Sequence, residues 1–472
     1  MSSIAELRTA GRTPRLPLCV EFSAGGTLLL EKQLRLVPGK RLVAQGRWND
    51  QTVLVKLFFA GAHQRHGERE RAGVVALQAA GVATPALLTA GAVQGGAYAV
   101  VSEFLPQAQT LAALADDDTT QKMAALSAIM PLLARMHAAG LAQADLHLGN
   151  FLQAQGQIYA IDGDAIIQHG GQALPRAQIL TNLAVLFAGL TPDWDAQHAA
   201  LLALYRAAPA AASLHLDEAF AADLPAAVHK TRARRLEKFL EKTGRDCTQF
   251  AVGRGERQAW AAVRPRLAEF APFFADPDRF VDAAHCFKTG GTCTVVASEI
   301  AGQTRLIKRY NLKNWRHALS RAWRPSRAWH SWRAAHLLDF YGIATPSPLA
   351  VLEERRGPLR GRAFLVTELC PGKNLLDTLN PAEIPPPQLA TALLKTFTAL
   401  YALRISHGDC KGTNLFWHAG KIYLIDLDAL TQHRSTWRFK RAWRRDRARF
   451  LRNWPADSPL VRWLDAQLPG GI

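Results

Sequence analysis

The two halves of the chain share one set of short motifs. The segment AQADLHLGNFLQAQGQIYAIDGDAI recurs as SHGDCKGTNLFWHAGKIYLIDLDAL, and four polar positions match at a single offset of 264 residues. Upstream, VVSEFLP recurs as LVTELCP, and TVLVKLFF recurs as TRLIKRYN. Such self-similarity predicts a tandem duplication of one domain of about 200 residues. The matched polar pairs are Asp145 and Asp409, Asn150 and Asn414, Asp162 and Asp426, and Asp164 and Asp428.

Length and composition are those of a globular protein. The 472 residues are 49% hydrophobic and 20% charged, and each copy is long enough to bury a core of its own. The sequence shows no run of about eighteen apolar residues, and its N-terminal segment lacks the apolar stretch of a signal peptide. The six cysteines form no C-x-x-C pair, which argues against a zinc site and against a disulfide framework. We therefore expect a cytosolic protein.

In each copy, segments with the pattern of strands come first and helical segments follow. In the first copy, RLVPGKRLVAQGRW and QTVLVKLFF predict strands joined by turns at residues 38–39 and 49–50. A helix is expected from Glu68 to about Gly81, followed by the strand AYAVVSEF and a long helix that ends at MHAAG. The second copy repeats this order. The pattern predicts an α+β protein in which each copy has a small antiparallel N-terminal sheet and a mainly helical C-terminal part.

The boundary between the copies is expected near residue 275. Residues 230–276 are mixed in charge and include the helix-prone run RARRLEKFLEKTGRDC. We therefore expect them to form a helical extension of the first copy and the connection to the second. The predicted domains are residues 15–275 and residues 276–472.

The polar residues of the first copy suit phosphoryl transfer. Such a site needs a strand lysine on the α/β-phosphates of ATP and a helix carboxylate that holds this lysine. It also needs an aspartate that orients the acceptor hydroxyl, and an asparagine and a second aspartate that bind Mg²⁺. Any one of these residues is common in loops and at strand edges, but the ordered set occurs twice, which favours a catalytic site. The first copy supplies Lys56, Glu70, Asp145, Asn150 and Asp162 in that order.

The second copy has the same set except for the helix carboxylate. Its matching residues are Lys308, Asp409, Asn414 and Asp426. Lys411 follows the predicted catalytic aspartate, where it could contact the γ-phosphate. The position that corresponds to Glu70 is Ser331, and no acidic residue occurs from Ile300 to Arg333. We therefore expect Lys308 to lack its usual anchor, which leaves two alternatives open. Either one copy is catalytic and the other regulatory or substrate-binding, or both act on different hydroxyls.

The motifs of the first copy resemble the lipopolysaccharide kinase family, the inner-core heptose and Kdo kinases of Gram-negative bacteria. Lys56, Glu70, DLHLGN and IDGDA carry the resemblance, and GKRLVAQGRW with VLVKLFF is similar to the N-lobe of that family. The likeness covers both halves and implies two tandem protein-kinase-like domains. It also implies ATP and Mg²⁺ as cofactors, with Glu103 and Glu368 of the matched segments placed in the nucleotide sites. The implied acceptor is a sugar hydroxyl of the lipopolysaccharide core at the cytoplasmic face of the inner membrane.

Some features depart from the family pattern. The first copy has Gln143-Ala144 before Asp145, where the family usually has His-Gly; the second copy keeps His407-Gly408. Neither DFG nor APE follows the predicted metal-binding aspartates. One alternative is therefore a tandem pseudokinase that serves as a scaffold in lipopolysaccharide assembly. Another is a kinase that acts on a protein or a small molecule.

The net charge of +18 is concentrated in two segments. Residues 305–333 carry +9 and residues 434–452 carry +8. The tryptophan spacing in both segments suits amphipathic helices. The tryptophans are either core residues with solvated arginines behind them, or part of a surface for anionic headgroups or an anionic glycolipid such as lipopolysaccharide core. Nucleic acid is disfavoured because no motif for it accompanies the charge. The six tryptophans of these segments are Trp315, Trp323, Trp329, Trp332, Trp437 and Trp443.

Overall fold

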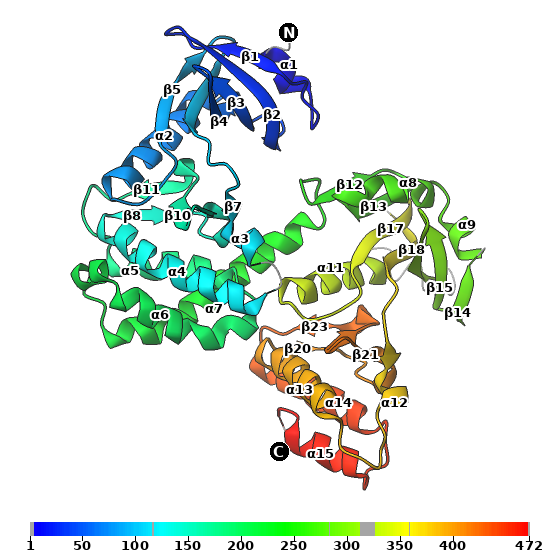
Figure 1. The fold of residues 1–472 in the computed structure, drawn as a ribbon. Helices are drawn as coiled ribbons and strands as arrows, with labels where there is room; N and C mark the ends of the chain where they lie inside the picture. Colours follow the sequence, from blue (N-terminus) through cyan, green and yellow to red (C-terminus); the bar gives the residue numbers. More distant parts are fainter. Residues whose placement is uncertain (1–3, 116–117, 283, 312–325, 358, 471–472) are drawn as a thin grey trace. The chain divides into compact units, whose positions relative to one another are not determined.

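The chain divides into two compact units (Figure 1). The computed structural model describes residues 4–115, 118–282, 284–311, 326–357 and 359–470. The first unit consists of Met1–Leu190 and Trp194–Arg232, and the second of Thr191–Asp193 and Ala233–Ile472. Within the described residues, no helix has both the length and the apolar character needed to cross a membrane.

The first unit begins with a six-stranded sheet. Its strands are β1 (Leu18–Glu21), β2 (Thr27–Val37), β3 (Arg41–Trp48), β4 (Gln51–Phe58), β5 (Leu87–Val93) and β6 (Ala97–Glu103). They pair antiparallel in the order β1-β2-β3-β4-β6-β5. The expected turns are confirmed: Gly39 lies in the turn between β2 and β3, and Asn49 and Asp50 join β3 to β4 with positive φ angles of 48° and 60°. Such angles are typical of a two-residue hairpin turn.

Side chains alternate along β4, and this alternation positions the strand lysine. Val55 and Leu57 are fully buried in the core on one face of the sheet. Lys56 therefore points to the opposite face. On that face its neighbours across β6 are Val100, directly opposite, and Tyr98.

Helix α2 (His63–Ala79) packs closely against the turn η2 (Gly163–Ala165). A Cβ atom at Gly73 would lie 2.1 Å from the carbonyl oxygen of Gly163, a distance that real side chains do not reach. Glycine at position 73 therefore permits this approach. The approach places Glu70, one turn earlier on the same helix, beside the start of η2.

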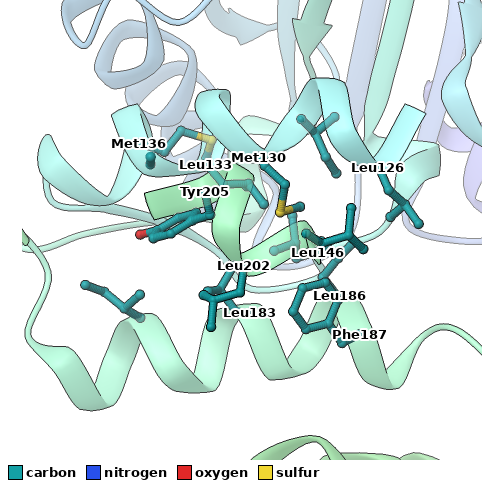
Figure 2. Close-up of a cluster of buried hydrophobic side chains, with 14 of the residues drawn as sticks. Leu126, Met130, Leu133, Met136, Leu146, Leu183, Leu186, Phe187, Leu202 and Tyr205 are labelled. Carbon is teal, nitrogen blue, oxygen red and sulfur yellow. The ribbon is translucent and has the colours of Figure 1, made fainter. Parts of the chain in front are cut away.

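The remainder of the first unit is mainly helical. Its core contains Leu126, Met130, Leu133, Leu183 and Tyr205 (Figure 2). The helices are α1 (Ile4–Thr9), α3 (Leu111–Leu114), α4 (Thr119–Ala138), α5 (Arg176–Ala188), α6 (His198–Ala207) and α7 (Glu218–Lys242), the last of which contributes to both units. The short strands are β7 (Gln109–Thr110), β8 (Leu141–Gln143), β9 (Phe151–Ala154), β10 (Gln157–Ala160) and β11 (Ile166–Gln168).

The second unit contains a seven-stranded antiparallel sheet. Its strands are β12 (Phe250–Arg254), β13 (Gln258–Val263), β14 (His285–Thr289), β15 (Cys293–Ile300), β16 (Gln303–Tyr310), β17 (Pro348–Arg356) and β18 (Leu359–Glu368). Their order is β12-β13-β17-β18-β16-β15-β14. The described helices are α8 (Leu267–Ala275), α9 (Pro277–Asp282), α11 (Arg327–Phe340), α12 (Leu375–Thr378), α13 (Pro387–Ala402), α14 (Thr436–Leu451) and α15 (Pro459–Gln467). The short strands are β19 (Lys373–Asn374), β20 (Ile405–Ser406), β21 (Leu415–His418), β22 (Lys421–Leu424) and β23 (Thr431–Gln432).

The predicted domain boundary at residue 275 is wrong. Strands β12 and β13 form a hairpin, and β13 joins the sheet of the second unit by pairing Ala261 with Val351 of β17. Phe250 of β12 packs against Trp332 of that unit, with ring centroids 6.0 Å apart. The second unit accordingly begins at Ala233. Hydrogen bonds to a strand nearly a hundred residues later decide this assignment, and local helix propensity carries no information about them.

The tryptophans of the two basic segments differ from one another in burial. Trp332 and Trp443 are buried and donate ring N–H bonds to backbone carbonyls, so they are core residues. Trp329 is partly buried, whereas Trp437 is 66% exposed. The expected helix around Trp315 and Trp323 lies outside the described residues. The amphipathic helix expected in the second segment is confirmed as α14, which buries Phe439, Trp443 and Phe450.

Candidate active site

The first unit brings three of its predicted site residues together around one ammonium group. The Lys56 Nζ atom lies 2.5 Å from Glu70 Oε1 and 3.3 Å from Asp162 Oδ1. Glu70 is only 3% exposed, and its carboxylate also accepts hydrogen bonds from the backbone N–H groups of Gly163 (3.2 Å) and Asp164 (2.8 Å). The helix carboxylate therefore fixes both the strand lysine and the turn that follows Asp162.

Asp162 is held at the end of a short strand in a left-handed conformation, with φ of 71°. An aspartate tolerates this geometry better than most residues, because its short polar side chain can hydrogen-bond locally. Arg41, the first residue of β3, reaches the same carboxylate: Nη1 lies 3.5 Å from Asp162 Oδ1. Arg41 was not among the residues predicted from the sequence, because no motif marks it and its partner Asp162 lies more than a hundred residues later.

The loop with Asp145 and Asn150 is hydrogen-bonded to the residue just before Asp162. The Asn150 Nδ2 atom donates to the Asp145 carbonyl at 2.7 Å, and the Ile161 N–H donates to the Asn150 carbonyl at 3.0 Å. Asp145 is 72% exposed at its side chain, and its Oδ2 atom lies 3.5 Å from His147 Nε2. The predicted acceptor-orienting carboxylate is thus exposed to solvent, on a loop whose backbone is held by hydrogen bonds of Asn150 and Ile161.

Gln143 makes the contact that histidine makes in the second unit. Its Nε2 atom donates to the Ile161 carbonyl at 2.8 Å, and His407 Nε2 contacts the Ile425 carbonyl at 3.0 Å. These residues correspond at the offset of 264. The departure from the His-Gly pattern therefore preserves the bond that joins this loop to the segment before Asp162.

A second pair of corresponding residues supports these loops from a helix. Asp446 of α14 is buried and accepts hydrogen bonds from the backbone N–H groups of His407 (2.6 Å) and Gly408 (3.0 Å). Burial raises the pKa of Asp446 even though these donors oppose the rise. In the first unit, Asn182 of α5 donates instead to the Gln143 carbonyl at 2.8 Å. Both loops are thus tied to a helix by one side chain.

The second unit holds its strand lysine differently. Lys308 Nζ lies 2.5 Å from Asp426 Oδ1 and 2.9 Å from Asp428 Oδ2. Ser331 of α11 occupies the position of the missing glutamate, and its hydroxyl donates to Asp428 Oδ1 at 2.7 Å. Burial opposes ionisation of Asp428, but Lys308, Tyr310 and Ser331 outweigh it and lower the pKa of this carboxyl to about 2. Lys308 thus lacks its usual anchor, the helix carboxylate, as expected, and Asp428, a carboxylate outside the helix, contacts it instead.

Asp409 in the second unit is surrounded by cations. Its Oδ2 atom lies 3.2 Å from Lys411 Nζ, and its Oδ1 atom lies 2.5 Å from Arg449 Nη2 of α14. Asn414 Nδ2 donates to the Asp409 carbonyl at 3.0 Å. Partial burial works to raise the pKa of Asp409, but Lys411, Arg449 and Asn414 lower it overall. The corresponding position to Arg449 in the first unit is Val185, so only the second loop carries this charge.

Two predicted nucleotide-site residues make other contacts. Glu103 is exposed at the end of β6, and its Oε2 atom accepts the Ala86 N–H at 3.4 Å. Glu368 at the end of β18 lies 3.7 Å from both Arg266 and Arg305. The structure therefore places both glutamates at strand ends and shows them with partners outside the lysine clusters.

The predicted metal ligands of the first unit are Asn150 and Asp162. The Asn150 amide nitrogen is engaged with Asp145, so the amide oxygen is the atom that could bind a cation. The described part of the chain contains no group of three or more His, Cys, Asp or Glu side chains arranged to hold a metal. Mg²⁺ is commonly bound by one or two carboxylates together with substrate phosphates, so two oxygen donors suit a metal that arrives with a nucleotide.

Comparison with known proteins identifies the family of the chain. The model of the lipopolysaccharide kinase (Kdo/WaaP) family matches residues 54–167 and 282–461, more than half of the chain. No curated protein matches the chain. A solved structure described as "Structure of vaccinia related kinase 3" matches with 12% identity and a TM-score of 0.30, covering 53% of this chain and 81% of that one. The chain belongs to the lipopolysaccharide kinase (Kdo/WaaP) family, and with it to the kinases.

Proposed function

We propose that the chain is a tandem of two kinase-like domains that transfers phosphate from ATP to a sugar hydroxyl, of heptose or Kdo, in the lipopolysaccharide inner core. The observation that carries the proposal is the contact of Lys56 with both Glu70 and Asp162, inside the region that the family model matches. A strand lysine held by a helix carboxylate next to a metal-binding aspartate is the arrangement that kinases use to position ATP phosphates.

Each residue of the first unit would then have a defined task. Lys56 would contact the α- and β-phosphates, and Glu70 would keep its ammonium group in place. Asp162 and the amide oxygen of Asn150 would hold Mg²⁺, which neutralises charge on the phosphates when bound. Asp145, exposed on its anchored loop, would orient the acceptor hydroxyl and accept its proton.

We also propose that α14 holds the protein against anionic glycolipid at the cytoplasmic face of the inner membrane. Trp437 is 66% exposed on this helix, and the Arg441 guanidinium lies 5.9 Å from the centre of its ring. Exposed tryptophan beside basic residues is typical of surfaces that bind anionic headgroups. The exposed basic residues of the helix include Arg438, Lys440, Arg441, Arg444 and Arg445.

A phosphotransfer assay tests the enzymatic proposal. The chain is mixed with ATP, Mg²⁺ and unphosphorylated lipopolysaccharide core, and phosphate on the sugar is measured. We expect transfer, and we expect Asp145→Asn to slow it by roughly 10²- to 10⁴-fold, as is typical when a general base is lost. Asp409→Asn is the matched variant in the second unit.

The same assay distinguishes the alternatives. Binding of ATP without transfer to any acceptor would favour a tandem pseudokinase that acts as a scaffold. Transfer to a protein or a free small molecule, with none to the core sugar, would replace the proposed acceptor. Full activity of Asp145→Asn together with an inactive Asp409→Asn would show that the second unit, not the first, performs the reaction.

A further inference from the structure

Three side chains around the strand lysine differ between the two units. Alignment of β4 with β16 pairs Phe58 with Tyr310, and alignment of α2 with α11 pairs His66 with Arg327 and Glu70 with Ser331. The first two replacements add a hydroxyl and a permanent positive charge, and the third removes a carboxylate. In the second unit, all three replacing residues contact one carboxylate, that of Asp428.

The contacts of Asp428 use both of its oxygens. Its Oδ1 atom accepts the hydroxyls of Tyr310 (2.6 Å) and Ser331 (2.7 Å). Its Oδ2 atom lies 2.5 Å from Arg327 Nη2 and 2.9 Å from Lys308 Nζ. The side chain of Asp428 is only 10% exposed, so these four partners hold the carboxylate in one orientation.

The corresponding aspartate of the first unit has a different set of partners. Asp164 Oδ2 lies 3.3 Å from His66, and its Oδ1 lies 3.4 Å from Arg69. The lysine there is held by Glu70, whose side chain reaches from α2 to the strand. Serine is too short to span the same distance from α11. Asp428 supplies the negative charge that the serine does not.

A residue that positions Lys308 has to keep its contact when a nucleotide binds together with a cation. Lys308 is largely buried, and a buried ammonium group is costly unless it is paired. Asp426 also contacts it, but Asp426 is the predicted metal ligand, and a bound cation competes for its oxygens. Asp428 is not a predicted metal ligand, so its contact with the ammonium group can persist in that state.

We propose that Asp428 takes the place of the helix glutamate as the residue that positions the phosphate-binding lysine, so that the second unit is a separate binding site for a nucleoside triphosphate with Mg²⁺. The proposal rests on the proposed function only for the use of ATP. It involves no sugar acceptor, so a failed phosphotransfer assay does not contradict it. Nucleotide binding alone decides it.

The test reads the two lysines separately in the full chain. An acyl-phosphate derivative of ATP acylates a lysine that contacts its phosphates, and mass spectrometry of the peptides measures modification of Lys56 and Lys308. The Mg-ATP concentration that halves each modification reports the affinity of each site, whatever the reactivity of its lysine. In the parent chain, we expect Mg-ATP to protect both lysines.

Removal of the Asp428 charge should affect one site alone. We expect Asp428→Asn to raise the half-protecting Mg-ATP concentration at Lys308 by roughly 10- to 100-fold, the range for loss of a hydrogen bond to a charged group. Protection of Lys56 should stay unchanged in the same molecule. Asp164→Asn is the matched control and should leave both sites unchanged, because Glu70 holds Lys56.

Rescue separates positioning from a general structural role. Adding Ser331→Glu to Asp428→Asn returns a carboxylate from the helix and should restore most of the protection of Lys308. If Asp428→Asn fails to fold, Ser331→Ala removes one donor to Asp428 while leaving both charges, and it should weaken protection of Lys308 severalfold. The proposal is overturned if Mg-ATP does not protect Lys308 in the parent. It is also overturned if a folded Asp428→Asn or Ser331→Ala chain matches the parent, or if Ser331→Glu does not rescue.

Discussion

Replacing Glu70 by glutamine tests the most strongly supported contact of the first unit. Glutamine keeps the length of the side chain and one acceptor oxygen, so the bond to a backbone N–H at Gly163 or Asp164 can persist. The ion pair with Lys56, 2.5 Å between Nζ and Oε1, is lost. The lysine is then free to turn toward Asp162, which lies 3.3 Å away, and to leave the nucleotide phosphates.

The expected size of the effect follows from the lost contact. A hydrogen bond to a charged group contributes about 1.5–3 kcal/mol, so loss of the lysine–phosphate contact should lower kcat/KM by roughly 10- to 100-fold. Glu70 is 3% exposed, so the loss of its charge is poorly compensated by water. We therefore also expect the free energy of unfolding to fall by about 1–3 kcal/mol.

The assay is steady-state phosphotransfer over a range of ATP concentrations. Both chains to be compared carry Asp409→Asn, so that turnover by the second unit does not contribute. Glu68→Gln is the matched control, because Glu68 lies on the same helix, is exposed and contacts Gln64. A Glu70→Gln chain whose kcat/KM stays within about threefold of the control has lost less than about 1 kcal/mol, and this result would refute the assigned role of Glu70.

Three other predictions address packing, pH and the basic helix. Gly73→Ala should lower both the melting temperature and the activity, because the added Cβ atom would lie 2.1 Å from the Gly163 carbonyl oxygen. In the control Gly61→Ala, the added Cβ atom has no neighbour within 4 Å, so this chain should behave as the parent. Equal melting temperatures of the two variants would contradict the packing argument. Burial lowers the pKa of His137 to about 4 and that of His336 to about 3, so protons bind the unfolded chain preferentially once the pH falls below about 6.5. The free energy of unfolding should therefore be highest above that pH and should fall by about 2 kcal/mol for each histidine by about pH 5. Urea unfolding should show that His336→Gln loses less of this free energy between pH 7 and pH 5 than the parent. A free energy of unfolding that does not change with pH would exclude the mechanism. Replacing four exposed arginines of α14 by glutamine should weaken binding to anionic vesicles by up to about 1 kcal/mol per residue, less at high salt, while the melting temperature stays unchanged. Vesicle binding equal to that of the parent would remove the membrane proposal. The four arginines are Arg438, Arg441, Arg444 and Arg445.

Local patterns in the sequence were sufficient for the elements that local physics decides. The β3–β4 hairpin follows from alternating apolar residues on either side of Asn49 and Asp50, which adopt the backbone angles that the turn requires. The same alternation places Lys56 on the face opposite to Val55 and Leu57. The order of Lys56, Glu70 and Asp162 along the chain was enough to predict that they meet, because this order is that of a kinase site and the motifs of Lys56 and Asp162 recur in the second half.

Residues whose partners are distant in the sequence were decided only by tertiary structure. Strand β13 lies in residues 230–276, which were expected to form a helical extension of the first copy. Its pairing with β17 instead assigns these residues to the second unit, which begins at Ala233. Arg449 lies in a helix that reads as a basic surface, yet it reaches Asp409. No local pattern predicts either contact, because both depend on how whole elements pack.

Asp428 shows most clearly what can be predicted from the sequence and what only the tertiary structure decides. The sequence alone revealed that Glu70 has no counterpart in the second half, since Ser331 stands at its position. It did not reveal the replacement, because Asp428 lies more than a hundred residues from Lys308 and follows a motif with its own predicted task. Only the packing of α11 against the turn that contains Asp428 brings the carboxylate within 2.9 Å of the ammonium group. A missing charge can be read from one position, but its substitute can come from any element that folds next to it.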